Sequence, residues 1–238
     1  MSKKSIYIII LFMFLFNYSL FSRDNYVPMD HRPLTILVEE DYILYAKRNL
    51  LLKYKLTTQE VDTINNELLP RQILTLASNK SKIYAGDVSY YYNKNNKTWE
   101  KDSGLFIFDK SSKLWERCSN FDDFIIRKII VNEQYLLLAT DKGVIKVDLN
   151  LTNQIIYNKS DGLESDNVYS LFQLNDTTVF IGIFRYGIGT HQERKDDMFG
   201  LGLNKINLKN HKITKIKFPK TEIPYYDKFL VLDMYPNI

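Results

Sequence analysis

One strand pattern recurs along this chain, and it constrains the fold more than any other feature of the sequence. Its clearest copy has apolar segments at 135–140, 143–148 and 154–157, followed by further segments at 168–174 and 178–182. Each segment is rich in β-branched and aromatic residues and is bounded by Asp, Asn, Gly or Ser, as β-strands are. The pattern therefore predicts short strands in a repeating order.

Four copies of a four-stranded unit can be aligned. Three of the four third strands begin with glycine, which we expect to supply the positive φ of a tight hairpin. Three end in Asp or Asn, which open turns. The first strands are expected at 34–38, 73–77, 124–131 and 168–174, the second at 42–46, 82–86, 135–140 and 178–182, the third at 49–54, 104–109, 143–148 and 202–207, the fourth near 56–64, 113–117, 154–157 and 212–218, and a spare first strand at 229–233.

Four-stranded units of about 40 residues joined by short turns are typical of β-propeller blades. We predict an all-β fold, a β-propeller of about four four-stranded blades within a repeat domain at 34–238, with blades at roughly 34–64, 73–117, 124–157 and 168–218 and the spare strand at 229–233. The composition agrees, because 25 Ile, 17 Tyr and 14 Phe stand against four Ala. The sequence leaves open whether the propeller closes or keeps an exposed sheet edge.

The first 22 residues predict export. Lys3 and Lys4 precede an apolar run of eleven residues at 6–16, which suits a signal peptide and is short for a membrane span. We expect a signal peptide or an uncleaved anchor at 1–22, a linker at 23–33, and an extracytoplasmic location: periplasm, cell surface or secreted. The single cysteine, Cys118, fits a bacterial exported protein and is expected to be a buried or half-buried thiol.

Three stretches of the best repeats resemble a known family. Residues 138–148, the run Asp-Gly-Leu-Glu-Ser-Asp-Asn-Val at 161–168 and the run Val-Phe-Ile-Gly at 179–182 are similar to the two-component regulator propeller repeat. That family lies in extracytoplasmic sensor domains of bacterial hybrid kinases. Leu137 and Phe180 stand where the family has tryptophan. The resemblance implies a propeller of the sensor type without its kinase, as a partial or truncated copy.

Two insertions between second and third strands supply the candidate ligand-binding residues. Long loops on a rigid repeat scaffold concentrate binding residues, and exposed aromatic rings with polar tips suit glycan or protein surfaces. The insertion at 88–103 contains Tyr91 and Trp99, and the insertion at 183–201 contains Arg185, Tyr186 and His191.

Other classes of site receive little support from the sequence. The three histidines are far apart, and the acidic loop with Asp161, Glu164 and Asp166 lacks the ligand spacing of an EF-hand, so we expect no metal and no cofactor. A net charge of +4 with scattered lysines argues against nucleic acid as a partner. Contact with a membrane is expected only through the N-terminal segment, and self-association only through an open sheet edge.

We therefore predict an exported, non-catalytic propeller module that binds a glycan, a peptide or a partner protein. Two alternatives remain at this point. One is a propeller-type hydrolase or lyase that uses the 183–201 insertion, and the other is a truncated sensor fragment without independent function.

Overall fold

The computed structural model describes residues 35–47, 50–64, 72–93, 98–183 and 202–216, with the backbone alone at 47, 88–93 and 98–102. The expected signal segment, linker and spare strand at 229–233 lie outside these residues. The strands, in chain order, are β1 (Thr35–Val38), β2 (Tyr42–Lys47), β3 (Leu50–Lys55), β4 (Val61–Thr63), β5 (Ile73–Ser78), β6 (Lys82–Asn93), β7 (Thr98–Asp109), β8 (Trp115–Cys118), β9 (Ile126–Val131), β10 (Tyr135–Thr140), β11 (Gly143–Asp148), β12 (Gln154–Tyr157), β13 (Val168–Asn175), β14 (Thr178–Ile183), β15 (Gly202–Asn207) and β16 (Lys212–Ile216).

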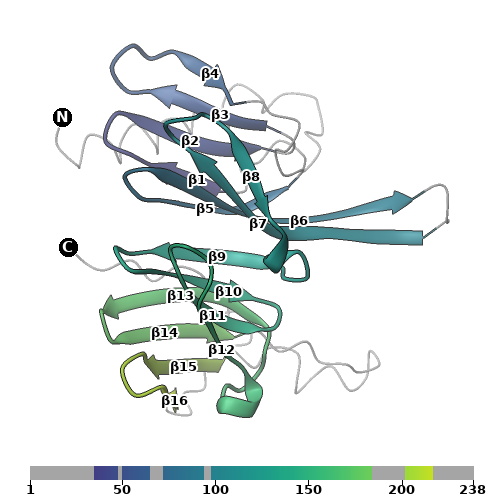
Figure 1. Ribbon diagram of the computed structural model, residues 1–238, viewed down its shortest axis with the longest axis vertical. Helices are drawn as coiled ribbons and strands as arrows, with labels where there is room; N and C mark the ends of the chain where they lie inside the picture. The colour runs from purple at the N-terminus through teal and green to yellow at the C-terminus, as the bar shows by residue number, and fades with distance from the viewer. Residues whose placement is uncertain (1–34, 48–49, 65–71, 94–97, 184–201, 217–238) are drawn as a thin grey trace, which may run out of the picture. The chain divides into compact units, whose positions relative to one another are not determined.

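These strands form four antiparallel sheets of four strands each. Every sheet is a meander in chain order, β1 to β4, β5 to β8, β9 to β12 and β13 to β16, and we number the sheets one to four accordingly. Figure 1 shows the sheets following one another along the chain. Two short 3-10 turns, at Ser119–Phe121 and Lys159–Asp161, are the helical elements of the described residues. The predicted all-β fold of four-stranded blades is confirmed.

The insertion at 88–103 continues the strands that flank it. β6 and β7 are each 12 residues long and stay in register from Lys82 opposite Asp109 to Asn93 opposite Thr98. The two strands run well past the rest of sheet two as a ribbon (Figure 1). The insertion is therefore a hairpin extension of β6 and β7.

Two local expectations were wrong. Gly104 has a φ of 153° but lies inside β7 opposite Asp87, so it serves no tight hairpin, whereas Gly143, with a φ of 117°, begins β11 directly after its hairpin turn. The fourth strand of sheet one begins at Val61 rather than near 56. A turn occupies residues 56–58, and Gln59, with a φ of 61°, closes it by donating its backbone N–H to the Lys55 carbonyl.

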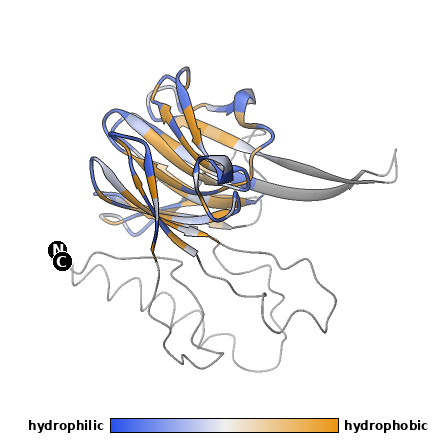
Figure 2. Cartoon of the chain, turned by 90° about the horizontal axis from the view of Figure 1, so that it is seen from below, coloured by the Kyte–Doolittle hydropathy of each residue, from blue (hydrophilic) through white to orange (hydrophobic). Residues whose placement is uncertain are grey.

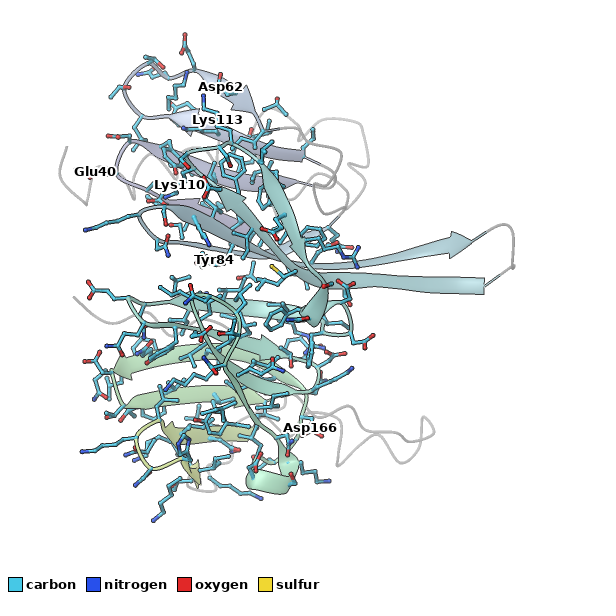
Figure 3. The ribbon with its side chains drawn as sticks, viewed as in Figure 1. Glu40, Asp62, Tyr84, Lys110, Lys113 and Asp166 are labelled. Atoms are coloured by element: carbon cyan, nitrogen blue, oxygen red, sulfur yellow. The ribbon has the colours of Figure 1, made fainter. Side chains whose placement is uncertain are left out.

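Apolar side chains fill the space between successive sheets. Alternation along each strand places one set of side chains against the preceding sheet and the other set against the following sheet. Three apolar clusters result, between sheets one and two, two and three, and three and four. Figure 2 shows the hydrophobic residues along the strands and the hydrophilic ones at the turns. Tyr84 of β6, fully buried between sheets two and three, is an example (Figure 3).

Gly86 allows one of these sheets to come unusually close to the next. A Cβ atom at Gly86 would lie 2.6 Å from the carbonyl oxygen of Ile126 in β9. The first strand of sheet three therefore approaches the backbone of β6 more closely than any side chain permits. A buried hydrogen bond supports the same contact, because the backbone N–H of Ile129 donates to Oγ1 of Thr75 over 3.3 Å.

Polar contacts at the turns add to the packing of sheets one and two. Nζ of Lys110, in the turn between β7 and β8, lies 3.3 Å from Oε1 of Glu39 and donates to the carbonyl of Asn79 over 2.7 Å. Ser78 also donates its hydroxyl to the Glu39 carboxylate. Lys110 thus ties the turn after β1 to two turns of the next sheet (Figure 3).

Candidate functional site

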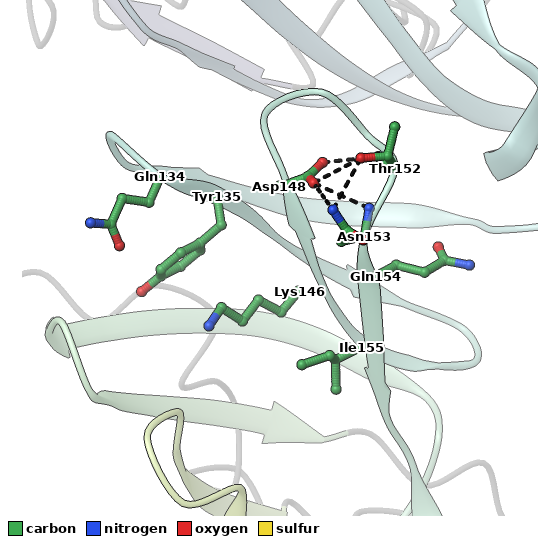
Figure 4. A pocket seen from close by; sticks show the side chains of 8 residues that line it. All are labelled: Gln134, Tyr135, Lys146, Asp148, Thr152, Asn153, Gln154 and Ile155. Atoms are coloured by element: carbon green, nitrogen blue, oxygen red, sulfur yellow. Dashed lines mark hydrogen bonds between the residues drawn. The ribbon is translucent and has the colours of Figure 1, made fainter.

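An open pocket of about 580 Å³ lies at the outer strands of sheet three. β10 and β11 provide its deeper wall, and β12 with the turn before it provides its rim. Most of the lining is amide, hydroxyl and amine, with one exposed aliphatic side chain. Figure 4 shows the lining residues: Gln134, Tyr135, Lys146, Asp148, Thr152, Asn153, Gln154 and Ile155.

Tyr135 and Lys146 form the wall of this pocket. The ammonium group of Lys146 lies 4.6 Å from the centroid of the Tyr135 ring, a cation–π distance. The Tyr135 hydroxyl accepts a hydrogen bond from Nε2 of Gln173 over 2.9 Å and donates to the carbonyl of Asp176 over 3.3 Å. Gln173 and Asp176 belong to sheet four. The Tyr135 side chain, which comes from sheet three, is therefore fixed by hydrogen bonds to the neighbouring sheet.

Asp148 organises the rim. Its carboxylate accepts hydrogen bonds from the backbone N–H groups of Thr152 and Asn153 over 2.9 and 3.2 Å and from both of their side chains over 2.9 and 2.6 Å. These hydrogen bonds, the backbone bond from Thr152 first among them, lower the pKa of Asp148 to about 2. The carboxylate therefore stays ionised near neutral pH. Its hydrogen bonds to Thr152 and Asn153 fix the turn that forms the rim of the pocket (Figure 4).

The Tyr–Lys pair is also a feature of the repeat. In sheet one, Nζ of Lys53 lies 4.0 Å from the centroid of the Tyr42 ring, at the strand positions equivalent to those of Lys146 and Tyr135. Only the pair of sheet three lines the pocket. The sequence contains this signal as a tyrosine opening the second strand and a lysine at the fourth position of the third strand. No motif distinguishes the pocket beyond that, and our sequence analysis missed it.

The residues proposed from the sequence are placed only in part. Tyr91 lies on β6 opposite Glu100, and Trp99 lies on β7 opposite Tyr92, so both belong to the extended ribbon and neither lines the pocket. Arg185, Tyr186 and His191 lie outside the described residues. The candidate roles of all five stay predictions.

Two carboxylates of the acidic loop, those of Asp161 and Asp166, stabilise the turn in which they lie. Oδ2 of Asp161 accepts from the backbone N–H of Asn158, and Oδ1 of Asp166 accepts from the backbone N–H of Lys159, over 2.9 and 2.6 Å. Both carboxylates thus hold the 3-10 turn that leads toward β13 (Figure 3). Cys118 is a half-buried thiol, as expected.

Solved structures show the same architecture. The extracellular domain of the putative hybrid two-component system BT4673 of B. thetaiotaomicron aligns with a TM-score of 0.58 and 15% identity, over 82% of this chain and 23% of its own. The corresponding domain of BT3049 from the same organism aligns with a TM-score of 0.54 and 13% identity, over 79% and 25%. The Neurospora crassa Pan2 WD40 domain aligns with a TM-score of 0.53 and 11% identity, over 78% and 52%.

These similarities show a β-propeller type of fold. The chain spans about a quarter of the length of the two bacterial extracellular domains and about half that of the WD40 chain. No protein-family profile and no curated protein matches the sequence. Within the described residues, no helix has the length and apolar character needed to cross a membrane.

Proposed function

We propose that this protein is an exported, non-catalytic propeller module that binds a polar ligand in the sheet-three pocket, with a glycan as the ligand class that its lining fits best. The bacterial structures that share its fold are extracellular domains, which supports an extracytoplasmic location. These domains belong to putative hybrid two-component systems, which supports a role in recognition rather than in turnover.

The observation that carries the proposal is the chemistry of the pocket. Amide side chains of Gln134, Asn153 and Gln154 offer donors and acceptors without net charge, which is how proteins match sugar hydroxyls. Lys146 adds a donor, and Ile155, 42% exposed, adds an apolar surface. General acid–base catalysis works best with a pKa near the operating pH, and Asp148, with a pKa of about 2, is far from it.

Lys146→Ala and Lys53→Ala make a matched pair of variants. Each removes a lysine from above a tyrosine ring, but only Lys146 lines the pocket. We expect the secreted protein to retain members of an oligosaccharide array and the Lys146→Ala variant to bind the retained members at least about tenfold more weakly, the loss of roughly one charged hydrogen bond. Lys53→Ala should bind as the parent protein does.

Two results would contradict the proposal. Equal losses in both variants would mean that the lysines act on stability and not on the ligand. Release of reducing sugar from a retained oligosaccharide would favour the hydrolase alternative, and chain cleavage should then be tested in variants of Arg185, Tyr186 and His191.

A further inference from the structure

Among the described residues, sheet one and sheet four each have one side that belongs to none of the three apolar clusters. We call the side of a sheet that packs on the following sheet its trailing face, and the side that packs on the preceding sheet its leading face. The trailing faces of the first three sheets carry a large and then a small residue two positions apart in the second strand. These pairs are Leu44 and Ala46, Tyr84 and Gly86, and Leu137 and Ala139.

Sheet four has the same pair on its trailing face, in Phe180 and Gly182 of β14. The register supports the equivalence, because Phe180 lies opposite Lys205 as Leu137 lies opposite Lys146. The Phe180 side chain is half-buried and belongs to none of the three apolar clusters of the described residues.

The first strand of sheet four also repeats a docking feature. In sheet two, Thr75 lies opposite Gly86 and accepts a backbone hydrogen bond from the following sheet. In sheet four, Ser170, a buried residue, lies opposite Gly182 at the equivalent strand position. In sheet two, a small residue beside a hydroxyl-bearing residue thus receives the first strand of the following sheet, and sheet four has the same two residue types at these positions.

Sheet one presents the complementary leading face. Ile43 lies opposite Tyr54, and Tyr45 lies opposite Leu52, so the four side chains share one side of β2 and β3. The same positions in sheet three hold Leu136 with Val147 and Leu138 with Ile145, all fully buried against sheet two. In sheet one, Tyr45, Leu52 and Tyr54 are only half-buried, and the apolar clusters of the described residues include none of the four.

We propose that a second copy of this chain occupies these faces, with the trailing face of each copy on the leading face of the other. The contact continues the type of interface that the chain already forms three times between its own sheets. A head-to-tail contact generates a closed ring when its rotation closes. The described residues of two copies contribute eight sheets, within the usual propeller range of about four to eight blades.

Light scattering on the full secreted protein tests this proposal. We expect twice the mass of one chain at micromolar concentration. Phe180→Lys places a charge on the trailing face and Tyr45→Lys places one on the leading face, so each variant should be a folded monomer with a cooperative thermal transition. Val61→Lys is the control on the outer edge strand β4, where the native side chain is 54% exposed, and it should stay dimeric.

Mixing the two face variants gives the sharpest result. The Phe180→Lys copy keeps its leading face and the Tyr45→Lys copy keeps its trailing face, so one native contact remains and the mixture should regain the dimer mass. A mixture that stays monomeric at the highest soluble concentration would overturn the head-to-tail arrangement. A monomeric parent protein would overturn the proposal in favour of closure within one chain, and a dimer abolished by Val61→Lys would overturn it in favour of edge pairing.

Discussion

The hydroxyl group of Tyr157, on β12, lies 2.8 Å from Nδ1 of His211, in the turn between β15 and β16, and the two rings stack with centroids 5.9 Å apart. The pair joins the outer strand of sheet three to the outer hairpin of sheet four. Apolar packing fills the interior of that interface, so this polar pair secures its outer end.

Tyr157→Phe removes the hydroxyl and leaves the ring in place. We expect the free energy of unfolding to fall by about 1 kcal/mol, the net contribution of an ordinary hydrogen bond. His211→Ala should cost a similar amount, and urea denaturation of both variants and of the double variant measures the coupling between them. Because the residues act on each other, the double variant should lose less than the sum of the single losses. Additive losses would show that the contact contributes nothing.

Gly86→Ala tests the close approach of β9 to β6. The added methyl group would lie 2.6 Å from the Ile126 carbonyl oxygen, and backbone on both sides has to shift. Overpacking of this kind costs about 1–3 kcal/mol of unfolding free energy. Leu114→Ala, at a side chain that is 62% exposed, serves as the control and should change stability by less than about 0.5 kcal/mol. An unchanged urea midpoint for Gly86→Ala would mean that the sheets can separate at no cost.

The carboxylates of Asp109 and Asp148 occupy the same position at the ends of their third strands. Each accepts hydrogen bonds from the turn that follows, chiefly from the Ser111 hydroxyl and the Thr152 backbone N–H respectively, and these lower both pKa values from 3.8 to about 2. A lowered pKa means that the stabilisation is fully present above pH 4 and is lost as the pH falls from about 4 to about 2.

The double variant Asp109→Asn, Asp148→Asn should therefore flatten the fall of the thermal midpoint below pH 4. Sheet four already uses the amide, because Asn207 accepts from the backbone N–H groups of Lys209 and Asn210 over 3.0 and 3.2 Å. Asp123→Asn, at an exposed carboxylate, is the control and should leave the fall of the thermal midpoint below pH 4 unchanged. If the double variant loses stability as steeply as the parent protein, the turns are not the source of the acid sensitivity.

The strand order was readable from the sequence because period-two alternation and turn residues act locally. The repeat at 135–157 matches its predicted strands without a change of bounds, and Asp148 opens its turn as expected. Gly104 was misjudged because a glycine before an apolar run looks the same at a hairpin and inside a long strand. Only the pairing of Asp87 with Gly104 separates the two cases, and that is a contact across the sheet.

The pocket could not be read in the same way. Its wall depends on Gln173 and Asp176, which approach Tyr135 from another sheet, and its rim depends on how four donors converge on Asp148. The contacts of Gln173 and Asp176 with Tyr135 cross between two sheets, so sequence spacing within one repeat contains no information about the wall. The candidate residues in the two insertions were chosen because the insertions are long and contain aromatic residues. Those properties say nothing about which side chains line a space between two sheets.

Cys118 offers a test of burial that needs no ligand. Removal from water, followed by the nearby charge of Glu116, raises the pKa of its thiol from 9.0 to about 11. Because the thiolate is the reactive form, alkylation by iodoacetamide at pH 8 should be on the order of 100-fold slower in the folded protein than in urea. Glu116→Gln should speed the folded-state reaction by removing the repulsion, without changing the rate in urea. Equal rates in buffer and in urea would show that the β8 end of sheet two is open to solvent.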